Sequence, residues 1–355
     1  MFKVLSLIRF LVLLGLGLIS SQATAQGLDS GATGANLANR DTPLEVAIGI
    51  EINQISFVDQ KSENYGAVAT IRAQWNDPLL AFDAKAYGSE FRVMKPATFI
   101  EHAASLGAIA PGFTIQNQQS NRWVHQSVVV IRANGDARFS ERSSLTLQAP
   151  DFNFTRYPFD RQKFFFEIVS VYPSELVTYT VLPEFSGLGD KLGEEEWILA
   201  NDRMETSKVV GLSGLESDMV ALAFEGKRHL MYYMIRIFLP MLVLVAVSWA
   251  TFFLEEYRKR IEVAGANLLM FIAFNWVISD DLPKLGYLTF LDFILQWMFV
   301  VTGAIIVFSV GLSRLKWSGR GDLAKRLDNY AVKWVYPLGY AAVVGFAVSN
   351  YLVLG

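Results

Sequence analysis

Hydrophobic and polar positions divide the chain into two parts with different patterns. From Pro43 to about Lys227, short apolar runs alternate with polar residues, as at residues 46–52 and 67–75, which is the period of half-buried β-strands. Asn134-Gly135 is a strong hairpin signal between two such runs. We therefore expect an antiparallel β-sandwich. Further strands are expected at residues 128–131, 164–166 and 177–182, and a short helix at residues 97–108.

After His229 the pattern changes to four long apolar segments, at residues 230–254, 261–278, 290–312 and 332–354. Each is long enough, or nearly so, to cross ~30 Å of hydrocarbon as a helix. The predicted fold is therefore an α+β membrane protein, in which an extracellular antiparallel β-sandwich is followed by a four-helix transmembrane bundle. We expect the two domains at residues 26–228 and 229–355, with helices at about 230–254, 258–280, 287–313 and 332–354.

Residues 1–25 have the pattern of a secretory signal peptide. Two basic residues, Lys3 and Arg9, precede a short apolar run at residues 10–19, and Ala23-Thr24-Ala25 fits a cleavage site. A fifth transmembrane helix is the alternative, but the run is too short to span a bilayer. Basic residues in the first and third loops put these loops in the cytoplasm, so both ends of the mature chain are expected outside. These residues are Arg258, Lys259, Arg260, Arg314, Lys316, Arg320, Lys325 and Arg326.

Composition excludes several kinds of chemistry. The chain of 355 residues is 52% hydrophobic, has a formal net charge of -3 and contains no cysteine, so disulfides, thiolate catalysis and cysteine metal sites are excluded. Its three histidines are scattered along the sequence, which argues against a metal cluster. The sequence has no nucleophile motif and no phosphate loop. We therefore expect no enzyme, no cofactor and no nucleic-acid partner.

The second apolar segment carries a stripe of residues spaced by four, three, four, three and four positions, which places them on one face of a helix. A carboxylate in hydrocarbon costs ~2.5–3.5 kcal/mol on insertion scales, and this favours an aqueous pore enclosed by several copies of the helix. Two alternatives remain open: Glu262 pairs with Arg258 one turn away, or the face is an ordinary packing seam. Leu269 and Trp276 would form apolar rings that close a pore by dewetting. The stripe consists of Glu262, Ala266, Leu269, Ala273, Trp276 and Asp280.

Several motifs resemble the pentameric ligand-gated ion channels, and in particular their prokaryotic branch. Tyr157-Pro158-Phe159-Asp160 with Gln162 is similar to the family's signature loop, and Pro150 and Phe164 stand where animal members have two cysteines. The resemblance covers essentially the whole mature chain, and the pore-helix motifs are similar to those of a proton-gated bacterial channel. The remaining matches are Pro240, Asn275, Leu282-Pro283-Lys284, Ile272-Ala273-Phe274-Asn275, Trp75-Asn76-Asp77 and Leu80-Ala81-Phe82-Asp83.

The resemblance implies five subunits around a pore lined by the second helix, with agonist bound between adjacent extracellular domains. A homopentamer in the bacterial inner membrane is therefore expected, with both mature termini on the outer side. The resemblance also implies that Arg228 meets Asp160 and links the sandwich to the pore. Asp59, Pro283 and Lys284 would complete this contact zone.

Charges along the stripe favour monovalent cations as the permeant ions. A ring of Arg258 residues would favour anions, but Glu262 lies deeper, at a narrow level where close charges act more strongly. Asp280 adds a second acidic level at the outer end. Neighbouring glutamates in a ring would repel one another, so permeation is expected to depend on pH. The alternatives are an anion-selective member of the same family and a membrane-anchored extracellular sensor without a pore.

The sequence specifies the activating ligand least of all. Amine-binding members use an aromatic box, whereas the loop C candidate at residues 209–218 has no aromatic residue, and Tyr172 stands at the loop B position. Protons are the second possibility, because Glu63 matches a proton-sensing carboxylate of the similar channel. Phe271 replaces that channel's membrane histidine, which counts against proton gating. We expect either an unidentified small ligand or protons.

Overall fold

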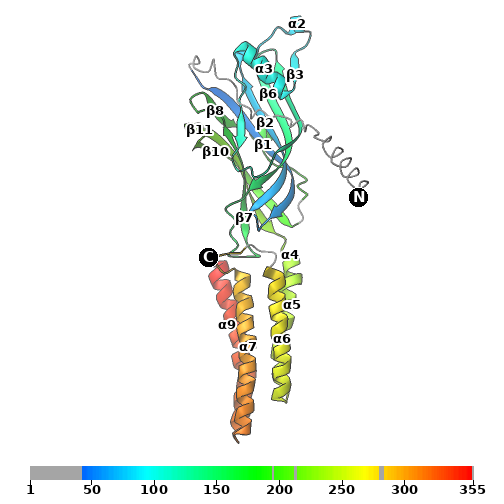
Figure 1. Ribbon diagram of the computed structural model, residues 1–355, viewed down its shortest axis with the longest axis vertical. Coiled ribbons are helices and arrows are strands. Elements are labelled where there is room, and N and C mark those ends of the chain that lie inside the picture. Colours follow the sequence, from blue (N-terminus) through cyan, green and yellow to red (C-terminus); the bar gives the residue numbers. More distant parts are fainter. Residues whose placement is uncertain (1–41, 194–195, 212–213, 280–283, 354–355) are drawn as a thin grey trace, which may run out of the picture.

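The computed structural model describes residues 42–193, 196–211, 214–279 and 284–353. It consists of a β-sandwich with four long helices extending from one end (Figure 1). The strands are β1 (Leu44–Asp59), β2 (Asn64–Asn76), β3 (Phe91–Met94), β4 (Phe113–Ile115), β5 (Trp123–Arg132), β6 (Asp136–Gln148), β7 (Arg161–Ser170), β8 (Val177–Val181), β9 (Gly187–Leu188), β10 (Trp197–Val210) and β11 (Glu216–Arg228). Two short helices, α2 (Ala84–Tyr87) and α3 (Pro96–Leu106), lie among them.

The strands form two sheets. The first has the order β3-β5-β6-β2-β1-β8, with β9 beside β1, and the second has the order β10-β11-β7-β4. The predicted fold class is confirmed with one difference, because β8 and β9 pair with β1 in parallel. Both strands follow β7, which belongs to the second sheet. The chain therefore re-enters the first sheet by crossing between layers, and a parallel pairing is the result.

Strand alternation and aromatic packing fill the core. Phe164 on β7 stacks on Phe224 of β11 with ring centroids 5.2 Å apart, and Tyr65 of β2 meets Phe164 edge-on at 5.2 Å. The predicted hairpin at Asn134-Gly135 is confirmed between β5 and β6. Gly135 has a φ of +88°, and a Cβ there would lie 2.5 Å from the Asp77 carbonyl oxygen, so glycine is required.

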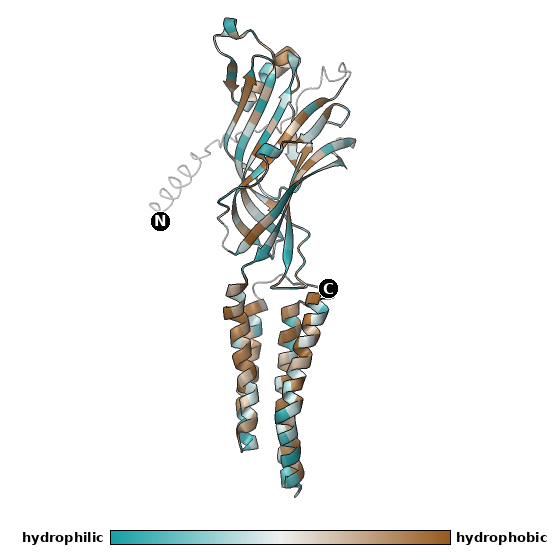
Figure 2. Cartoon of the chain, turned by 180° about the vertical axis from the view of Figure 1, so that it is seen from behind, coloured by the Kyte–Doolittle hydropathy of each residue, from teal (hydrophilic) through white to brown (hydrophobic). Residues whose placement is uncertain are grey.

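The four apolar segments form four helices that are long and apolar enough to cross a membrane, and hydrophobic residues dominate them in Figure 2. The first and last contain π-helical turns just before Pro240 and Pro337, where the missing proline N–H prevents regular α-helical bonding. In chain order the elements are α4 (Leu230–Tyr233), a π turn (Met234–Phe238), α5 (Leu239–Ala250), a 3-10 turn (Thr251–Phe253), α6 (Tyr257–Ser279), α7 (Phe290–Trp317), α8 (Gly321–Tyr330), a π turn (Ala331–Val335), α9 (Tyr336–Ala347) and a π turn (Val348–Val353).

The third and fourth helices extend farther than the sequence pattern predicts. α7 ends at Trp317 and α8 begins at Gly321, whereas apolar content suggested limits near 313 and 332. Charged residues such as Lys325 continue these helices outside the apolar region, where hydropathy gives no signal. α7 begins at Phe290, because Thr289 and Asp292 form a capping box there.

Candidate functional site at the domain junction and along α6

Arg228, the last residue of β11, is buried at the junction between the sandwich and the helices. Its Nε donates to Asp160 Oδ1 at 2.8 Å and its Nη2 to Asp160 Oδ2 at 3.2 Å. The two side chains are 0% and 1% exposed. A bidentate, charge-assisted pair of this kind fixes both distance and orientation.

Three further polar groups surround the same guanidinium. Nη1 donates to Glu196 Oε1 and to the Tyr233 hydroxyl, each at 3.0 Å, and Nη2 donates to Gln60 Oε1 at 3.0 Å. Burial is the largest single influence and lowers the pKa of Arg228, but the charge and hydrogen bond of Asp160, together with Tyr233 and Tyr157, outweigh burial and raise the pKa. The Arg228 cluster (Gln60, Asp160, Glu196, Arg228 and Tyr233) therefore joins four chain segments, from the β1–β2 turn to α4.

The signature loop also contacts the helices directly. Phe159 lies with its ring centroid 5.9 Å from Phe238 and 5.6 Å from Phe290, the first residue of α7. The Phe290 N–H donates to the Thr155 carbonyl at 2.8 Å. The loop thus links the sandwich to both the first and the third membrane helix.

A second hydrogen bond connects this loop to the segment between α6 and α7. The Phe154 N–H donates to the Tyr287 hydroxyl at 3.1 Å. Sequence reasoning missed Tyr287, Phe290 and Glu196 as junction residues. Of these, only Phe290 had a local signal, since Thr289 and Asp292 mark a helix start beside it.

The other predicted coupling residues have different surroundings. Asp59 accepts hydrogen bonds from the backbone N–H groups of Lys61 and Ser62 and from the Ser62 hydroxyl. These bonds, the Ser62 hydroxyl first, lower the pKa of Asp59. Lys284 is exposed and forms no ion pair with Asp59, both being described residues. Pro283 lies outside the described residues.

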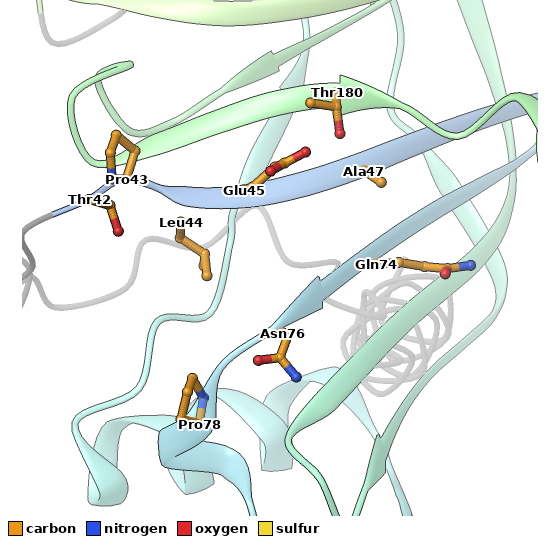
Figure 3. A pocket seen from close by; sticks show the side chains of 9 residues that line it. All are labelled: Thr42, Pro43, Leu44, Glu45, Ala47, Gln74, Asn76, Pro78 and Thr180. Atoms are coloured by element: carbon orange, nitrogen blue, oxygen red, sulfur yellow. The ribbon is translucent and has the colours of Figure 1, made fainter.

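A cavity of about 730 Å³ opens beside the Arg228 cluster. The β1–β2 turn, Glu196 and Tyr233 form its polar wall, and Phe274 and Val277 of α6 form its apolar wall. Movement of the turn relative to α6 would change the shape of this space. A separate hollow of about 610 Å³ lies at the far end of the sandwich, between the start of β1 and the end of β2, with Glu45 as its charged side chain (Figure 3).

One face of α6 is packed inside the chain. Ala264, Asn267, Phe271 and Ile278 are all buried. The Asn267 amide donates to the Leu244 carbonyl at 3.0 Å and to the Ser248 hydroxyl. Polar bonds within an apolar bundle fix the rotation of a helix about its axis, so the opposite face is directed away from α5.

A partly buried ion pair holds the start of the same helix. Arg260 donates to Asp328 at 2.6 and 2.9 Å and to the Leu254 carbonyl at 2.6 Å. This contact joins α6 to α8, at the end of the bundle far from the sandwich. It adds a second constraint on how α6 is turned.

The predicted stripe lies on the exposed face of α6. Leu269 is 66% exposed and Trp276 is 76% exposed, and Glu262, Ala266 and Ala273 are also exposed. Asp280 lies outside the described residues. Five stripe residues thus share a surface that no other helix covers within the part of the chain that the structure describes.

Glu262 forms the i,i+4 pair that was one of the alternatives. Arg258 Nε lies 3.1 Å from Glu262 Oε1, and the two side chains are 90% and 62% exposed. Such exposed pairs contribute ~0.3–0.5 kcal/mol and exchange readily with water. The carboxylate therefore has a counter-charge and remains accessible to solvent.

Comparisons with known proteins agree with this geometry. Residues 33–209 match the neurotransmitter-gated ion-channel ligand binding domain. The chain is 26% identical to the proton-gated ion channel of Gloeobacter violaceus over 270 residues, which are 75% of this chain and 69% of that protein. It is also 26% identical to the glutamate-gated chloride channel of Drosophila melanogaster over 292 residues, 76% of this chain and 58% of that protein. The chain belongs to the pentameric ligand-gated ion channel family.

A third relative is the glycine receptor subunit beta of Rattus norvegicus, 22% identical over 260 residues, which are 70% of this chain and 51% of that subunit. The chain therefore spans just over half of the two animal relatives. This member of the family is a multi-pass membrane protein with an extracellular sandwich, and its relatives are ion channels rather than enzymes.

The two predicted ligand-sensing residues of the channel lie apart. Tyr172 is only 7% exposed, and its hydroxyl donates to the Ala110 carbonyl at 3.4 Å, so in the single chain its ring is not presented at the surface. Glu63 lies in the β1–β2 turn with a φ of +48°, and its carbonyl accepts from the Ala149 N–H at 2.8 Å. The structure does not bring these two residues together.

An outward row of arginines on β2 and β6 was missed from the sequence. The register pairs Thr70 with Arg142, Arg72 with Ser140 and Gln74 with Arg138, so the three arginines share one face of the channel's first sheet. The Arg72 guanidinium lies 4.0 Å above the Phe185 ring, with Arg138 at 5.9 Å. The sequence signal that could have identified this row was an arginine placed between two inward-facing residues of a strand, which indicates that the arginine faces outward.

Proposed function

We propose that this chain forms a homopentameric, cation-selective ligand-gated channel in the bacterial inner membrane, with both mature termini on the outer side. The observation that carries the proposal is the division of α6 into two faces. Asn267 and Phe271 are buried against the chain's own helices, whereas Glu262, Ala266 and Leu269 are exposed. A single chain leaves this carboxylate-bearing face uncovered, and a ring of five would turn it toward water.

Glu262 supports selection of cations, since a ring of carboxylates at a narrow level attracts them. Asp280 would add an acidic level at the outer mouth. The alternative is an anion channel, which Arg258 at the helix start and the chloride channel among the relatives favour. The two choices differ in which member of the exposed pair faces the permeating ion.

Leu269 and Trp276 are proposed as the gate. Both are large, apolar and exposed, and they lie seven residues apart, about 10 Å along the helix. Rings of such side chains exclude water when the pore narrows. Ala273 lies between these two residues and Ala266 lies one turn before Leu269, and both small side chains leave space for hydrated ions.

The Arg228 cluster is proposed to carry movement of the sandwich to the pore, with Asp59, Pro283 and Lys284 as neighbours in the same zone. The cluster and the signature loop connect the sandwich to the first and third helices. α7 in turn packs along α6. A displacement of the signature loop would therefore reach the pore helix through packed elements rather than through a flexible linker.

For the activating ligand, the arginine row favours a small anion such as a carboxylate over an amine. Arg72 and Arg138 converge on Phe185, and guanidinium groups bind carboxylates in a bidentate manner. Two of the relatives are named for glutamate and glycine, which both carry a carboxylate. Protons are the second candidate, supported by Glu63 and the proton-gated relative, with Tyr172 as a further proposed ligand contact.

The pore assignment can be tested by cysteine accessibility, because the chain contains no cysteine of its own. Ala266→Cys places a thiol on the exposed face of α6, and Ala264→Cys places one on its buried face. We expect a charged thiol reagent to block current through the Ala266→Cys channel and to leave the Ala264→Cys channel unchanged. Equal modification of both, or of neither in any state, would reject this pore.

The recording must first establish a current. Protein in planar bilayers is exposed to glutamate, to glycine and to steps from neutral to acidic pH, and the reversal potential is measured in asymmetric KCl. A reversal potential near that of potassium supports cation selectivity, and one near that of chloride supports the alternative. No current under any condition would favour a sensor without a pore.

A further inference from the structure

Three polar side chains form a continuous chain of hydrogen bonds in the middle of the helix bundle. Asn267 on α6 is 4% exposed, and Ser248 on α5 and Thr302 on α7 are both 0% exposed. The Asn267 amide donates to the Ser248 hydroxyl, and the hydroxyl oxygens of Ser248 and Thr302 lie 3.4 Å apart. One residue from each of three membrane helices therefore takes part in this polar chain.

The donors and acceptors of the polar chain run in one direction. The Thr302 hydroxyl donates its only proton to the Met298 carbonyl at 2.9 Å, so it acts as the acceptor toward Ser248. The Ser248 hydroxyl therefore accepts from Asn267 and donates to Thr302. The other amide hydrogen of Asn267 is directed to the Leu244 carbonyl at 3.0 Å. Hydrogen bonds that follow one another in this way polarise and strengthen each other in a medium of low dielectric constant.

Asn267 lies almost directly behind the proposed gate residue Leu269. Two residues correspond to a rotation of about 200° and a rise of about 3 Å along an α-helix, so the two side chains leave α6 at nearly the same height on nearly opposite faces. Leu269 is accordingly 66% exposed, whereas Asn267 is buried. A rotation of α6 large enough to withdraw Leu269 from the exposed face must therefore break the hydrogen bonds of Asn267.

The position of Asn267 along α6 separates the level proposed for ion selection from the level proposed for the gate. Within the described part of the chain, the side chains of α6 form hydrogen bonds to other helices at two places. Arg260 bonds to Asp328 of α8, and Asn267 bonds to α5. Glu262 lies between these two places, whereas Leu269 lies beyond the second. The orientation of Leu269 thus depends on packing and on the bonds of Asn267.

We propose that Asn267 is a positioning residue for the gate, which holds Leu269 toward the pore axis through the polar chain of Ser248 and Thr302. This role rests on the proposed function, because it takes the exposed face of α6 as the surface of the pore. Asn267 does not touch the permeating ion and acts only through the orientation of the helix. Loss of the polar chain lets α6 turn, so the channel opens without its ligand. Ion selection at Glu262 is retained, because Arg260 still holds the start of the helix.

Thiol modification tests the orientation of α6 without any ion current. Ala264→Cys places a thiol on the buried face, one turn from Asn267, in a chain with no cysteine of its own. Its reaction with a charged thiol reagent is followed by mass spectrometry in proteoliposomes, alone and combined with Asn267→Leu or with Thr302→Val, which preserves shape. We expect both additions to raise the reaction rate roughly threefold or more, the change in equilibrium that one interhelical hydrogen bond supports in a membrane.

Ser309→Ala is the matched control for removing a buried hydroxyl. Ser309 is also on α7 and 0% exposed, but its hydroxyl has no hydrogen-bond partner within the described part of the chain. Ser309→Ala should leave the reaction of Ala264→Cys unchanged. Equal rates in all backgrounds, or an equal increase with Ser309→Ala, would overturn the positioning role. Failure of the proposed pore appears separately, as an Ala266→Cys thiol that the reagent does not reach in any background.

Currents in planar bilayers add a readout that a general loss of packing would not change selectively. Asn267→Leu and Thr302→Val should each raise the basal current as a fraction of the maximal current, with the reversal potential in asymmetric KCl unchanged. The double variant should have no larger effect than Asn267→Leu alone, because both substitutions interrupt one polar chain. Additive effects of the two substitutions, or a shift of the reversal potential, would contradict a positioning role for Asn267.

Discussion

Two of the arginine–carboxylate pairs in the chain have opposite character. Arg228 and Asp160 are 0% and 1% exposed and form a bidentate contact, whereas Arg258 and Glu262 are 90% and 62% exposed and form a single one. The first guanidinium has four polar partner residues, and three of them come from distant segments of the chain. The second has a partner one turn away on its own helix.

The difference in burial distinguishes an ion pair that must stay closed from one that can exchange its partners with water and ions. Charges removed from water must remain paired, because a stranded buried charge costs several kcal/mol. An exposed pair holds little energy and can open to admit another ion. The buried pair is suited to carry force across the domain junction, and the exposed pair is suited to interact with permeating ions.

The largest expected effect comes from breaking the buried pair. Asp160→Asn preserves shape but leaves Arg228 without its main counter-charge, so we expect a loss of about 3 kcal/mol. At about 2.1 cal/mol/K of unfolding entropy per residue, a chain of 355 residues would lose roughly 4 °C in Tm, measured by thermal unfolding of the purified protein.

The matched control breaks an exposed pair. Arg203 and Glu205 lie 2.6 Å apart with side chains 51% and 46% exposed, and Glu205→Gln is expected to change stability by less than about 0.5 kcal/mol. Similar losses in both variants would show that burial does not distinguish the two kinds of pair.

A smaller effect is expected where the signature loop meets the segment before α7. Tyr287→Phe removes the hydroxyl that accepts from the Phe154 N–H at 3.1 Å, and the lost bond should cost about 1 kcal/mol. Hydrogen exchange around Phe154 should become faster. Tyr330→Phe is the control, because Tyr330 is 62% exposed. Unchanged exchange in Tyr287→Phe would place this contact outside the cooperative junction.

The sequence predicted the elements of this protein better than their connections. Alternation between residues 46 and 52 and the Asn134-Gly135 turn located strands because both signals are local. The parallel pairing of β8 with β1 joins residues more than a hundred positions apart, and no local pattern encodes it. The helix α8 was missed because it is polar, and a search for apolar segments finds only the part of a helix that lies within the membrane.

The same distinction holds for the site. The stripe on α6 is a local periodicity, and its exposed face agrees with the predicted spacing. The pairing of Arg228 with Asp160 spans 68 residues and was expected only through a family resemblance. Glu196 and Tyr287 had no motif to mark them, and their contacts to Arg228 and Phe154 span 32 and 133 residues.

Glu167 is half-buried, between the two pairs in its degree of burial, and it should make the stability of the protein depend on pH. Burial, and then the nearby Asp151 carboxylate, raise the pKa of Glu167 above 4.5. The folded state therefore holds the proton more tightly than the unfolded state, so stability falls as pH rises from about 4.5 through the folded pKa. Glu167→Gln should raise Tm by about 1 °C at pH 7 and leave it unchanged at pH 4. A lower Tm at pH 7 would contradict this cause.

The smallest change in stability is expected for the exposed pair, where the effect on ion selectivity should be the largest. Arg258→Gln should alter the free energy of unfolding by only ~0.3–0.5 kcal/mol, because both side chains are already solvated. It also frees the Glu262 carboxylate, so the reversal potential in asymmetric KCl should move toward that of potassium. Glu262→Gln should move it toward that of chloride, and the double variant should lie between the two. If Arg258→Gln leaves the reversal potential unchanged while Glu262→Gln shifts it, the arginine points away from the ion path and the carboxylate alone sets selectivity.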